Sequence, residues 1–179
     1  MSIAMPFNFT QWIEDNKDKL KPPIANKNMY PLGKDFIVMV VGGPNARKDY
    51  HFNETEELFY QIKGDIQVTI QQDGKAVKVP IKEGEMFLLP ANVPHSPNRD
   101  EGSIGLVIER VRKGTEFKDG LMWFCDQCNY KLFEERFTLN DIEKDFLNVF
   151  KKYFNSEEHR TCDKCGTIME TDPKFITKK

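Results

Sequence analysis

The sequence has few of the features that would assign it to a membrane, a nucleic-acid complex or a secretory route. Its longest uninterrupted apolar run, residues 36–41, is far too short to cross a bilayer. Its net charge is −2 and it has no dense run of Lys and Arg, so no nucleic-acid footprint is expected. Residues 1–6 lack the basic stretch and apolar core of a secretory signal. We therefore expect a cytoplasmic protein with neither a membrane nor a nucleic acid as partner.

Histidine and cysteine are also scarce, with three and four residues among 179. In a reducing compartment, cysteines are more often metal ligands than disulfides. Hydrophobic residues make up 39% of the chain and charged residues 30%, which favours a packed core over disorder. The length is sufficient for one β-barrel or sandwich with a small appendage, but short for two full domains.

The chain begins with a helical pattern and then changes to short strands. Asn8 is placed to cap a helix that runs to about residue 20, and Gln11 is placed to complete a capping box. Strand patterns follow in segments 35–41, 57–62, 66–70, 77–81, 86–89 and 104–111. Asp73-Gly74 is a strong hairpin signal. Short strands with frequent turns are typical of an antiparallel barrel or sandwich.

The last third contains an amphipathic helix that lies between two Cys-x-x-Cys pairs. The apolar face of this helix consists of Ile142, Phe146, Val149, Phe150 and Tyr153. The two pairs use every cysteine in the chain: Cys125, Cys128, Cys162 and Cys165. Two such pairs can close a tetrahedral four-sulfur site for iron or zinc. Two disulfides or four free thiols are the alternatives. A closed site has no open position, so we expect a structural role, with a redox or iron-reservoir role as the alternative.

Two of the three histidines lie in segments with a recognisable spacing. His51 precedes Glu57 by an even number of positions, which along one extended strand puts both side chains on the same face. His95 follows two prolines that fix its approach. These segments resemble the two motifs of the cupin superfamily, with Asn53 in place of the second histidine and Asn92 in place of a glycine.

The cupin resemblance implies a metal site made of His51, Glu57 and His95. The loss of a ligand at Asn53 leaves two histidines and one carboxylate, a set typical of ferrous iron with open coordination positions. A chelating aromatic substrate and dioxygen can fill those positions. A histidine that is only hydrogen-bonded within the barrel is the competing interpretation.

A closer resemblance, over nearly the whole chain, is to the 3-hydroxyanthranilate 3,4-dioxygenase family. The matching segments are PPIAN (22–26), GGPNARKDYH (42–51), EELFYQ (56–61), LPANVPHSP (89–97) and ER (109–110). The cysteine pairs resemble the bacterial and fungal branch, which has a rubredoxin-like site. The resemblance implies Fe(II)-dependent ring cleavage of 3-hydroxyanthranilate by O2 to 2-amino-3-carboxymuconate semialdehyde, which closes to quinolinate, a precursor of NAD in the kynurenine pathway.

The same resemblance implies roles for residues outside the metal set. Arg99 would bind the substrate carboxylate through its planar fork, and Arg47 would line the pocket for substrate or O2. Glu109 shares the parity of inward-facing valines and would receive the proton of the substrate hydroxyl. Glu57 also borders the substrate and O2 site, and Asn26 would close the pocket. By composition alone, Arg47 and Arg99 lie in polar segments that read as solvated loops.

The expected fold is mainly β: a cupin barrel (double-stranded β-helix or jelly roll) with an N-terminal helix over residues 1–115. Residues 116–179 would form a C-terminal helix and the four-cysteine knot. A homodimer is expected by analogy with other cupins. The alternatives are another cupin oxygenase, a sugar isomerase, or a non-enzymatic metal-ribbon module. Asn53 argues against the isomerase, and the complete set of His51, Glu57 and His95 argues against the module.

Overall fold

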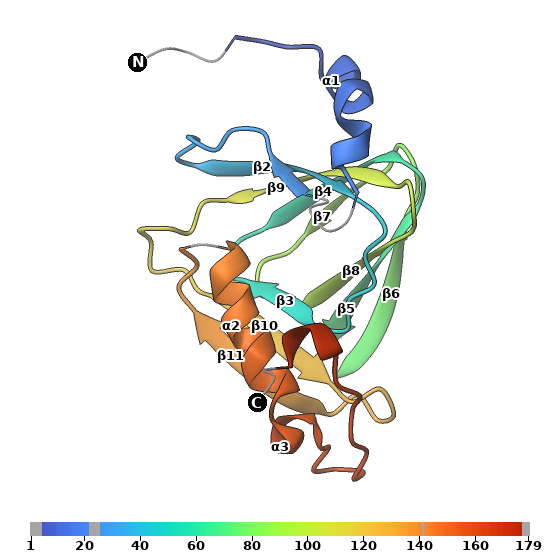
Figure 1. Ribbon diagram of the computed structural model, residues 1–179, viewed down its shortest axis with the longest axis vertical. Coiled ribbons are helices and arrows are strands. Elements are labelled where there is room, and N and C mark those ends of the chain that lie inside the picture. The colour runs from blue at the N-terminus through green and yellow to red at the C-terminus, as the bar shows by residue number, and fades with distance from the viewer. Residues whose placement is uncertain (1–4, 22–25, 141, 177–179) are drawn as a thin grey trace.

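The structure, a computed structural model, describes residues 5–21, 26–140 and 142–176 and contains two antiparallel sheets (Figure 1). One sheet has the order β1-β2-β9-β4-β7, with strands Asn26–Asn28, Phe36–Gly42, Ile104–Arg110, Glu57–Lys63 and Met86–Leu89. The other has the order β11-β10-β3-β8-β5-β6, with strands Lys131–Phe137, Asp119–Phe124, Tyr50–Asn53, His95–Arg99, Ile66–Gln72 and Lys75–Ile81. The expected mainly β architecture, built from antiparallel strands, is confirmed.

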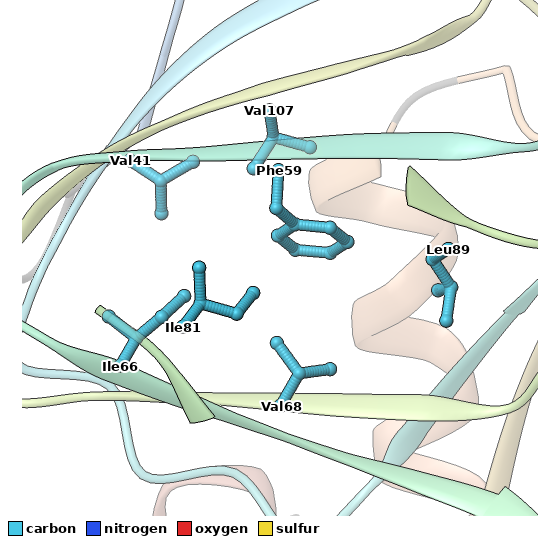
Figure 2. Close-up of a cluster of buried hydrophobic side chains, with 7 residues drawn as sticks. All are labelled: Val41, Phe59, Ile66, Val68, Ile81, Leu89 and Val107. Atoms are coloured by element: carbon cyan, nitrogen blue, oxygen red, sulfur yellow. The ribbon is translucent and has the colours of Figure 1, made fainter. Parts of the chain in front are cut away.

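The barrel core lies between the two sheets. It consists of buried side chains from both: Val41, Phe59, Ile66, Val68, Ile81, Leu89 and Val107 (Figure 2). Successive side chains of a strand alternate between its faces, so each strand contributes every second residue. Full burial of such a side chain stabilises the fold by about 1.5–3 kcal/mol. The predicted hairpin is also confirmed, since Asp73 and Gly74 join β5 to β6 with φ angles of 50° and 74°.

The N-terminal helix α1 (Phe9–Asn16) packs against the outer face of the five-stranded sheet. Its residue Ile13 clusters with Val40 and Ile104. Asn8 caps the helix, because its side chain accepts a hydrogen bond of 2.9 Å from the backbone N–H of Gln11. The reciprocal half of the predicted capping box is wrong, since the side chain of Gln11 donates to Asp15 instead. The chain continues as a 3₁₀ turn, η1 (Lys17–Lys19).

The C-terminal region extends the barrel and then covers it. Strand β10 pairs with both β3 and β11, so residues 119–137 continue the six-stranded sheet. Helix α2 (Ile142–Phe154) packs across this extension (Figure 1). Trp123 of β10 stacks on Tyr153 of this helix, with ring centroids 4.2 Å apart. Helix α3 (Glu157–Arg160) and the 3₁₀ turn η2 (Pro173–Phe175) follow. The division into 1–115 and 116–179 stays a prediction.

Candidate metal centre and active site

Three strands contribute the side chains of the predicted metal site. His51 lies in β3 and His95 in β8, directly opposite each other in an antiparallel pair. Glu57 begins β4, which belongs to the other sheet. His51 and Glu57 therefore do not lie along one extended strand, as their spacing had suggested, because the chain changes sheets between them. Their side chains converge because the inner faces of the two sheets meet at this end of the barrel.

The ligand atoms of these three residues lie close enough to share one ion. All are buried and lie within 4.8 Å of one another. Glu57 Oε2 is 3.2 Å from His95 Nε2 and 4.0 Å from His51 Nδ1. This oxygen has no hydrogen-bond partner among the described residues. A buried carboxylate oxygen without such a partner, facing two imidazole nitrogens, fits a bound metal ion, with ligand bonds of roughly 2.0–2.2 Å.

The two departures from the cupin motifs have a clear structural basis. Asn53, in place of a histidine, is buried and donates through Nδ2 to Glu109 Oε2 at 3.1 Å. Its Oδ1 accepts hydrogen bonds from the backbone and hydroxyl of Thr55. Asn92, in place of a glycine, has a φ of 67°, and asparagine is one of the few residues that adopt this left-handed conformation readily. The loop before His95 therefore keeps its turn.

Glu109 lies beside Glu57 in the adjacent strand β9, so two carboxylates face the same interior space. Burial, reinforced by the charge of Glu57, raises the pKa of Glu109 to about 7, although the guanidinium of Arg112 opposes the shift. Burial also works against the charge of Glu57, but the imidazoles of His95 and His51 hold the pKa of Glu57 well below its usual range. Two neighbouring carboxylates with such different affinities for protons can divide the roles of metal ligand and proton acceptor.

Arg99 points into the barrel rather than into a solvated turn. It ends β8 and is only 4% exposed. Its Nη1 donates to Gln61 Oε1 at 3.2 Å, and burial lowers the pKa of Arg99 to about 10. Gly105 makes room for the guanidinium, because a Cβ at that position would lie 2.8 Å from Arg99 Nη1. The guanidinium remains a buried cation with hydrogen-bonding capacity for an anionic ligand.

Arg47 lies at the edge of the site, between the barrel and helix α2. It is ion-paired with Asp49 through both carboxylate oxygens, and its Cζ lies 5.9 Å from the ring centroids of Phe146 and Phe150. Phe146 in turn lies 5.5 Å from the ring of His51. Asn26, by contrast, is exposed in the edge strand β1, opposite Val41. The roles of both residues stay predictions.

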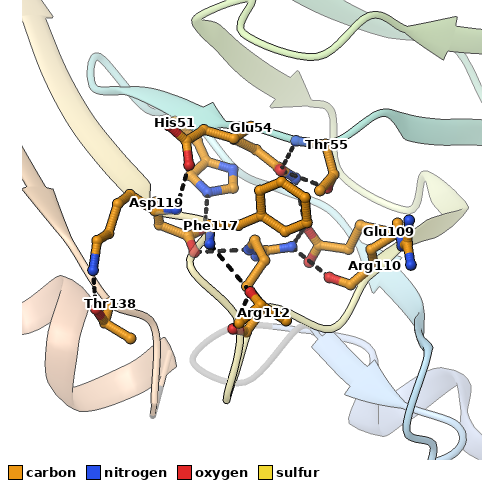
Figure 3. A network of polar contacts seen from close by, with 12 residues as sticks. His51, Glu54, Thr55, Glu109, Arg110, Arg112, Phe117, Asp119 and Thr138 are labelled. Atoms are coloured by element: carbon orange, nitrogen blue, oxygen red, sulfur yellow. Dashed lines mark hydrogen bonds and ion pairs between the residues drawn. The ribbon is translucent and has the colours of Figure 1, made fainter.

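Two further charged residues complete the site, and the sequence interpretation missed both. Asp119, fully buried at the start of β10, accepts a hydrogen bond of 2.8 Å from His51 Nε2. Arg112, 1% exposed, donates to both Asp119 and Glu109 (Figure 3). Burial tends to raise the pKa of Asp119, but the hydrogen bonds from His51 and Arg112 outweigh it and keep the pKa below its usual value. The only sequence feature that could have indicated this pair is that Arg112 follows Glu109 by three residues.

The four cysteines, which lie in two separate segments of the chain, converge on one point. Their sulfur atoms form one group, with Cys125 Sγ 3.6 Å from Cys165 Sγ and Cys128 Sγ 3.5 Å from Cys162 Sγ. Sulfur atoms bound tetrahedrally at about 2.3 Å from an ion lie roughly 3.8 Å apart, so the cluster fits a four-sulfur metal site.

The two cysteine turns have the same backbone hydrogen bonds. The N–H of Cys125 donates to the Tyr130 carbonyl, and that of Cys162 to the Thr167 carbonyl, each at 2.8 Å. In each turn the residue after the second cysteine has a positive φ: 56° at Asn129 and 74° at Gly166. Glycine and asparagine tolerate this conformation, which closes the turn around the sulfur atoms.

Comparisons with known proteins agree over almost the entire chain. Residues 1–154 match the family model described as 3-hydroxyanthranilic acid dioxygenase. A protein from Xanthomonas euvesicatoria pv. vesicatoria, named 3-hydroxyanthranilate 3,4-dioxygenase, is 49% identical over 98% of both chains. A protein of the same name from Bacillus thuringiensis is 46% identical, over 91% of this chain and 90% of its own.

Among solved structures, a cupin-2 domain containing protein from Shewanella frigidimarina is similar with a TM-score of 0.46 and 18% identity. The alignment covers 55% of this chain and 92% of that one. In the part of the chain that the structure describes, no helix is long and apolar enough to cross a membrane.

Proposed function

The chain belongs to the 3-hydroxyanthranilic acid dioxygenase family, and on that premise we propose that ferrous iron bound by His51, Glu57 and His95 serves its reaction. The protein is a ring-cleaving dioxygenase that converts 3-hydroxyanthranilate and O2 into 2-amino-3-carboxymuconate semialdehyde. Both oxygen atoms enter the product, and the bond beside the hydroxyl carbon breaks. The product closes to quinolinate without an enzyme.

The donor set supports iron over zinc. Two imidazoles and one carboxylate leave up to three positions of an octahedral ion open, which suits an ion that must accept a chelating substrate and O2. When bound, ferrous iron supplies redox chemistry toward O2 that zinc with the same ligands does not. The buried Glu57 Oε2, without a hydrogen-bond partner among the described residues, is the observation that carries the assignment of a metal ion to this site.

The remaining residues of the site match the groups of the substrate. Arg99 binds the substrate carboxylate, since its guanidinium is buried and, among the residues that the structure describes, donates one hydrogen bond, to Gln61. Glu109 receives the proton of the substrate hydroxyl, because a pKa of about 7 lets it both accept and return a proton near neutral pH. Arg47 forms one wall beside Phe146 and holds substrate or O2, and Asn26 closes the pocket.

The other parts of the proposal concern the molecule as a whole. Cys125, Cys128, Cys162 and Cys165 bind a second ion, iron or zinc, that has a structural role. The protein acts in the cytoplasm as a homodimer and supplies quinolinate for NAD biosynthesis. The two-part organisation, a barrel over 1–115 and an appendage over 116–179, is retained as part of this proposal.

Oxygen uptake after ferrous reconstitution tests the reaction. The protein is loaded with Fe(II) under anaerobic conditions, mixed with 3-hydroxyanthranilate and then exposed to air. We expect one O2 consumed per substrate and the absorbance of the semialdehyde, followed by quinolinate. A Glu57→Gln variant should lose both iron and uptake. Iron-loaded protein that binds substrate but consumes no O2 would contradict the proposal.

A further inference from the structure

The reaction proposed above uses Glu109 and the three metal ligands, but it leaves a buried cation, Arg112, without a role. Arg112 follows strand β9, and its side chain is fully buried between the two sheets. Burying a charge is costly unless it is paired and hydrogen-bonded, so a residue in this position needs an explanation.

One guanidinium contacts two carboxylates that belong to different sheets. Its Nε donates to Asp119 Oδ2 at 2.7 Å, and its Nη1 donates to Glu109 Oε2 at 2.8 Å (Figure 3). Asp119 begins β10 in the six-stranded sheet, whereas Glu109 lies near the end of β9 in the five-stranded sheet. Arg112 therefore ties together the two sheets at the same end of the barrel as the metal site.

The first of these carboxylates controls a metal ligand. Asp119 Oδ1 accepts a hydrogen bond from His51 Nε2, and an ionised carboxylate can only accept, so this nitrogen carries the proton. The lone pair of His51 is then on Nδ1, the nitrogen that faces Glu57. A carboxylate behind a histidine ligand fixes both the tautomer and the angle of the ring.

The second carboxylate is the acid–base candidate. Glu109 Oε2 accepts from Arg112 and from Asn53, so both contacts converge on one oxygen. These two donors set the direction of the carboxyl group relative to Glu57. A change in the position of Arg112 thus acts on the metal ligand and on the proton acceptor together.

We propose that Arg112 is a positioning residue for the ring-cleaving reaction, which aligns His51 through Asp119 and Glu109 directly. This inference rests on the proposed function for Glu109 and the metal. It requires arginine, since a guanidinium presents Nε and Nη1 to two separate acceptors, whereas the ammonium of lysine is a single compact point charge.

The test uses Co2+ as a probe of the histidine site in the absence of substrate. The four-cysteine site is first loaded with zinc, so that weak cobalt d–d absorption without sulfur charge-transfer bands reports the histidine site alone. For Arg112→Lys we expect Co2+ to bind about 10–100-fold more weakly, the usual effect of losing a group that orients a metal ligand. Asp119→Asn should weaken binding at least as much. The double variant should bind no more weakly than Asp119→Asn, because Arg112 acts on His51 only through Asp119.

Kinetics of the iron-loaded protein show whether Arg112 positions the site residues or only stabilises the fold. Arg112→Lys should lower kcat at least tenfold and leave KM for 3-hydroxyanthranilate within about threefold, because Arg99 is unchanged. Arg136→Lys, an arginine on β11 that stacks over Phe52, is the matched control and should bind Co2+ like the wild type. Urea unfolding of each variant gives the folded fraction.

Three outcomes would overturn the proposal. The first is that Arg112→Lys binds Co2+ within twofold of the wild type, and the second is that the losses of the two single variants add up in the double variant. The third is that Arg112→Lys loses stability but keeps an unchanged kcat per folded molecule. If Arg112→Lys does not fold, Asp119→Asn must still lower both Co2+ affinity and kcat. Cobalt binding needs no substrate, so wild-type protein that binds Co2+ but consumes no O2 contradicts the proposed function and not this network.

Discussion

Asn92 shows how a single backbone angle determines which residues a position accepts. Its φ is 67°, three residues before His95, and its N–H donates to the Asn53 carbonyl at 2.9 Å. Glycine adopts this conformation without strain, whereas alanine clashes with its own backbone. We expect Asn92→Ala to lower the free energy of unfolding by about 1–2 kcal/mol. Urea denaturation measures this, and Asn92→Gly is the control that should stay within about 0.5 kcal/mol. Equal losses in both variants would show that the asparagine side chain matters instead.

Replacement of Arg99 tests whether the substrate carboxylate needs the two parallel hydrogen-bond donors of a guanidinium. Arg99→Lys keeps the charge but loses the second hydrogen bond, and charge-assisted hydrogen bonds contribute about 1.5–3 kcal/mol. We expect KM for 3-hydroxyanthranilate to rise roughly 10–100-fold, measured by oxygen uptake at saturating O2. Arg110→Lys, at the exposed end of β9, should leave KM unchanged. A normal KM with a lowered kcat would assign Arg99 a different role.

Site residues that belong to a sequence motif could be predicted from the sequence, whereas residues that come together only in the fold could not. His51, Glu57 and His95 were predicted from motif spacing, and the structure brings their ligand atoms together. Arg112 and Asp119 lie close in the sequence but form no motif, because their pairing depends on how the chain crosses from the five-stranded to the six-stranded sheet between β9 and β10. A buried ion pair between sheets leaves no local periodicity, so a single sequence cannot reveal it.

At the scale of elements, strand β4 shows why hydrophobic alternation can mislead. The strand was predicted over 57–62. Leu58, Tyr60 and Ile62 share one face and Glu57, Phe59 and Gln61 the other, as the alternating burial pattern shows. The inner face, however, is the one with Glu57 and Gln61, because the site needs polar groups inside the barrel. The more apolar face is the outer one, where Tyr60 is 36% exposed. The alternation predicts the strand, but only the site explains its orientation.

Helix α2 was predicted from its periodic apolar face, and Phe146, Val149 and Tyr153 are buried as that pattern requires. Its contact with the site was not predicted. Phe146 and Phe150 flank the guanidinium of Arg47, and an aromatic face attracts such a cation. A helix that follows the barrel in sequence therefore also forms a wall of the candidate active site.

Phe150→Leu tests the contribution of the aromatic ring beside Arg47 without leaving a large cavity. Leucine keeps most of the packing but removes the ring, and a cation–π contact contributes about 0.5–2 kcal/mol. If Arg47 binds substrate, we expect KM to rise about 2–20-fold, with a smaller change in kcat, measured by oxygen uptake. Leu147→Ala, on the exposed side of α2, is the control and should match the wild type. An unchanged KM in Phe150→Leu would indicate that the ring serves packing alone.

At the scale of the whole molecule, the four-cysteine site joins two distant parts of the chain. Cys125 directly follows β10, whereas Cys162 and Cys165 follow α3, so the proposed ion at this site would hold the C-terminal helices against the barrel. The pairing of β10 with β3 does not depend on that ion, since Leu121 lies opposite His51 within the sheet itself. The metal ligands of the barrel should therefore remain in place when the sulfur site is lost.

Cys125→Ser separates the two metal sites. We expect two metal ions per wild-type chain and one in the variant, counted by elemental analysis. The variant should lose stability, although less than the roughly 10–16 kcal/mol that structural zinc supplies to isolated peptides, because the barrel core remains. Turnover per folded molecule should fall by less than about threefold, since β3, β4 and β8 still hold His51, Glu57 and His95.

Ser156→Ala, at the N-cap of α3, is a control that loosens the same region without removing a ligand. Retained stability with lost turnover would instead favour a redox or reservoir role for the second ion.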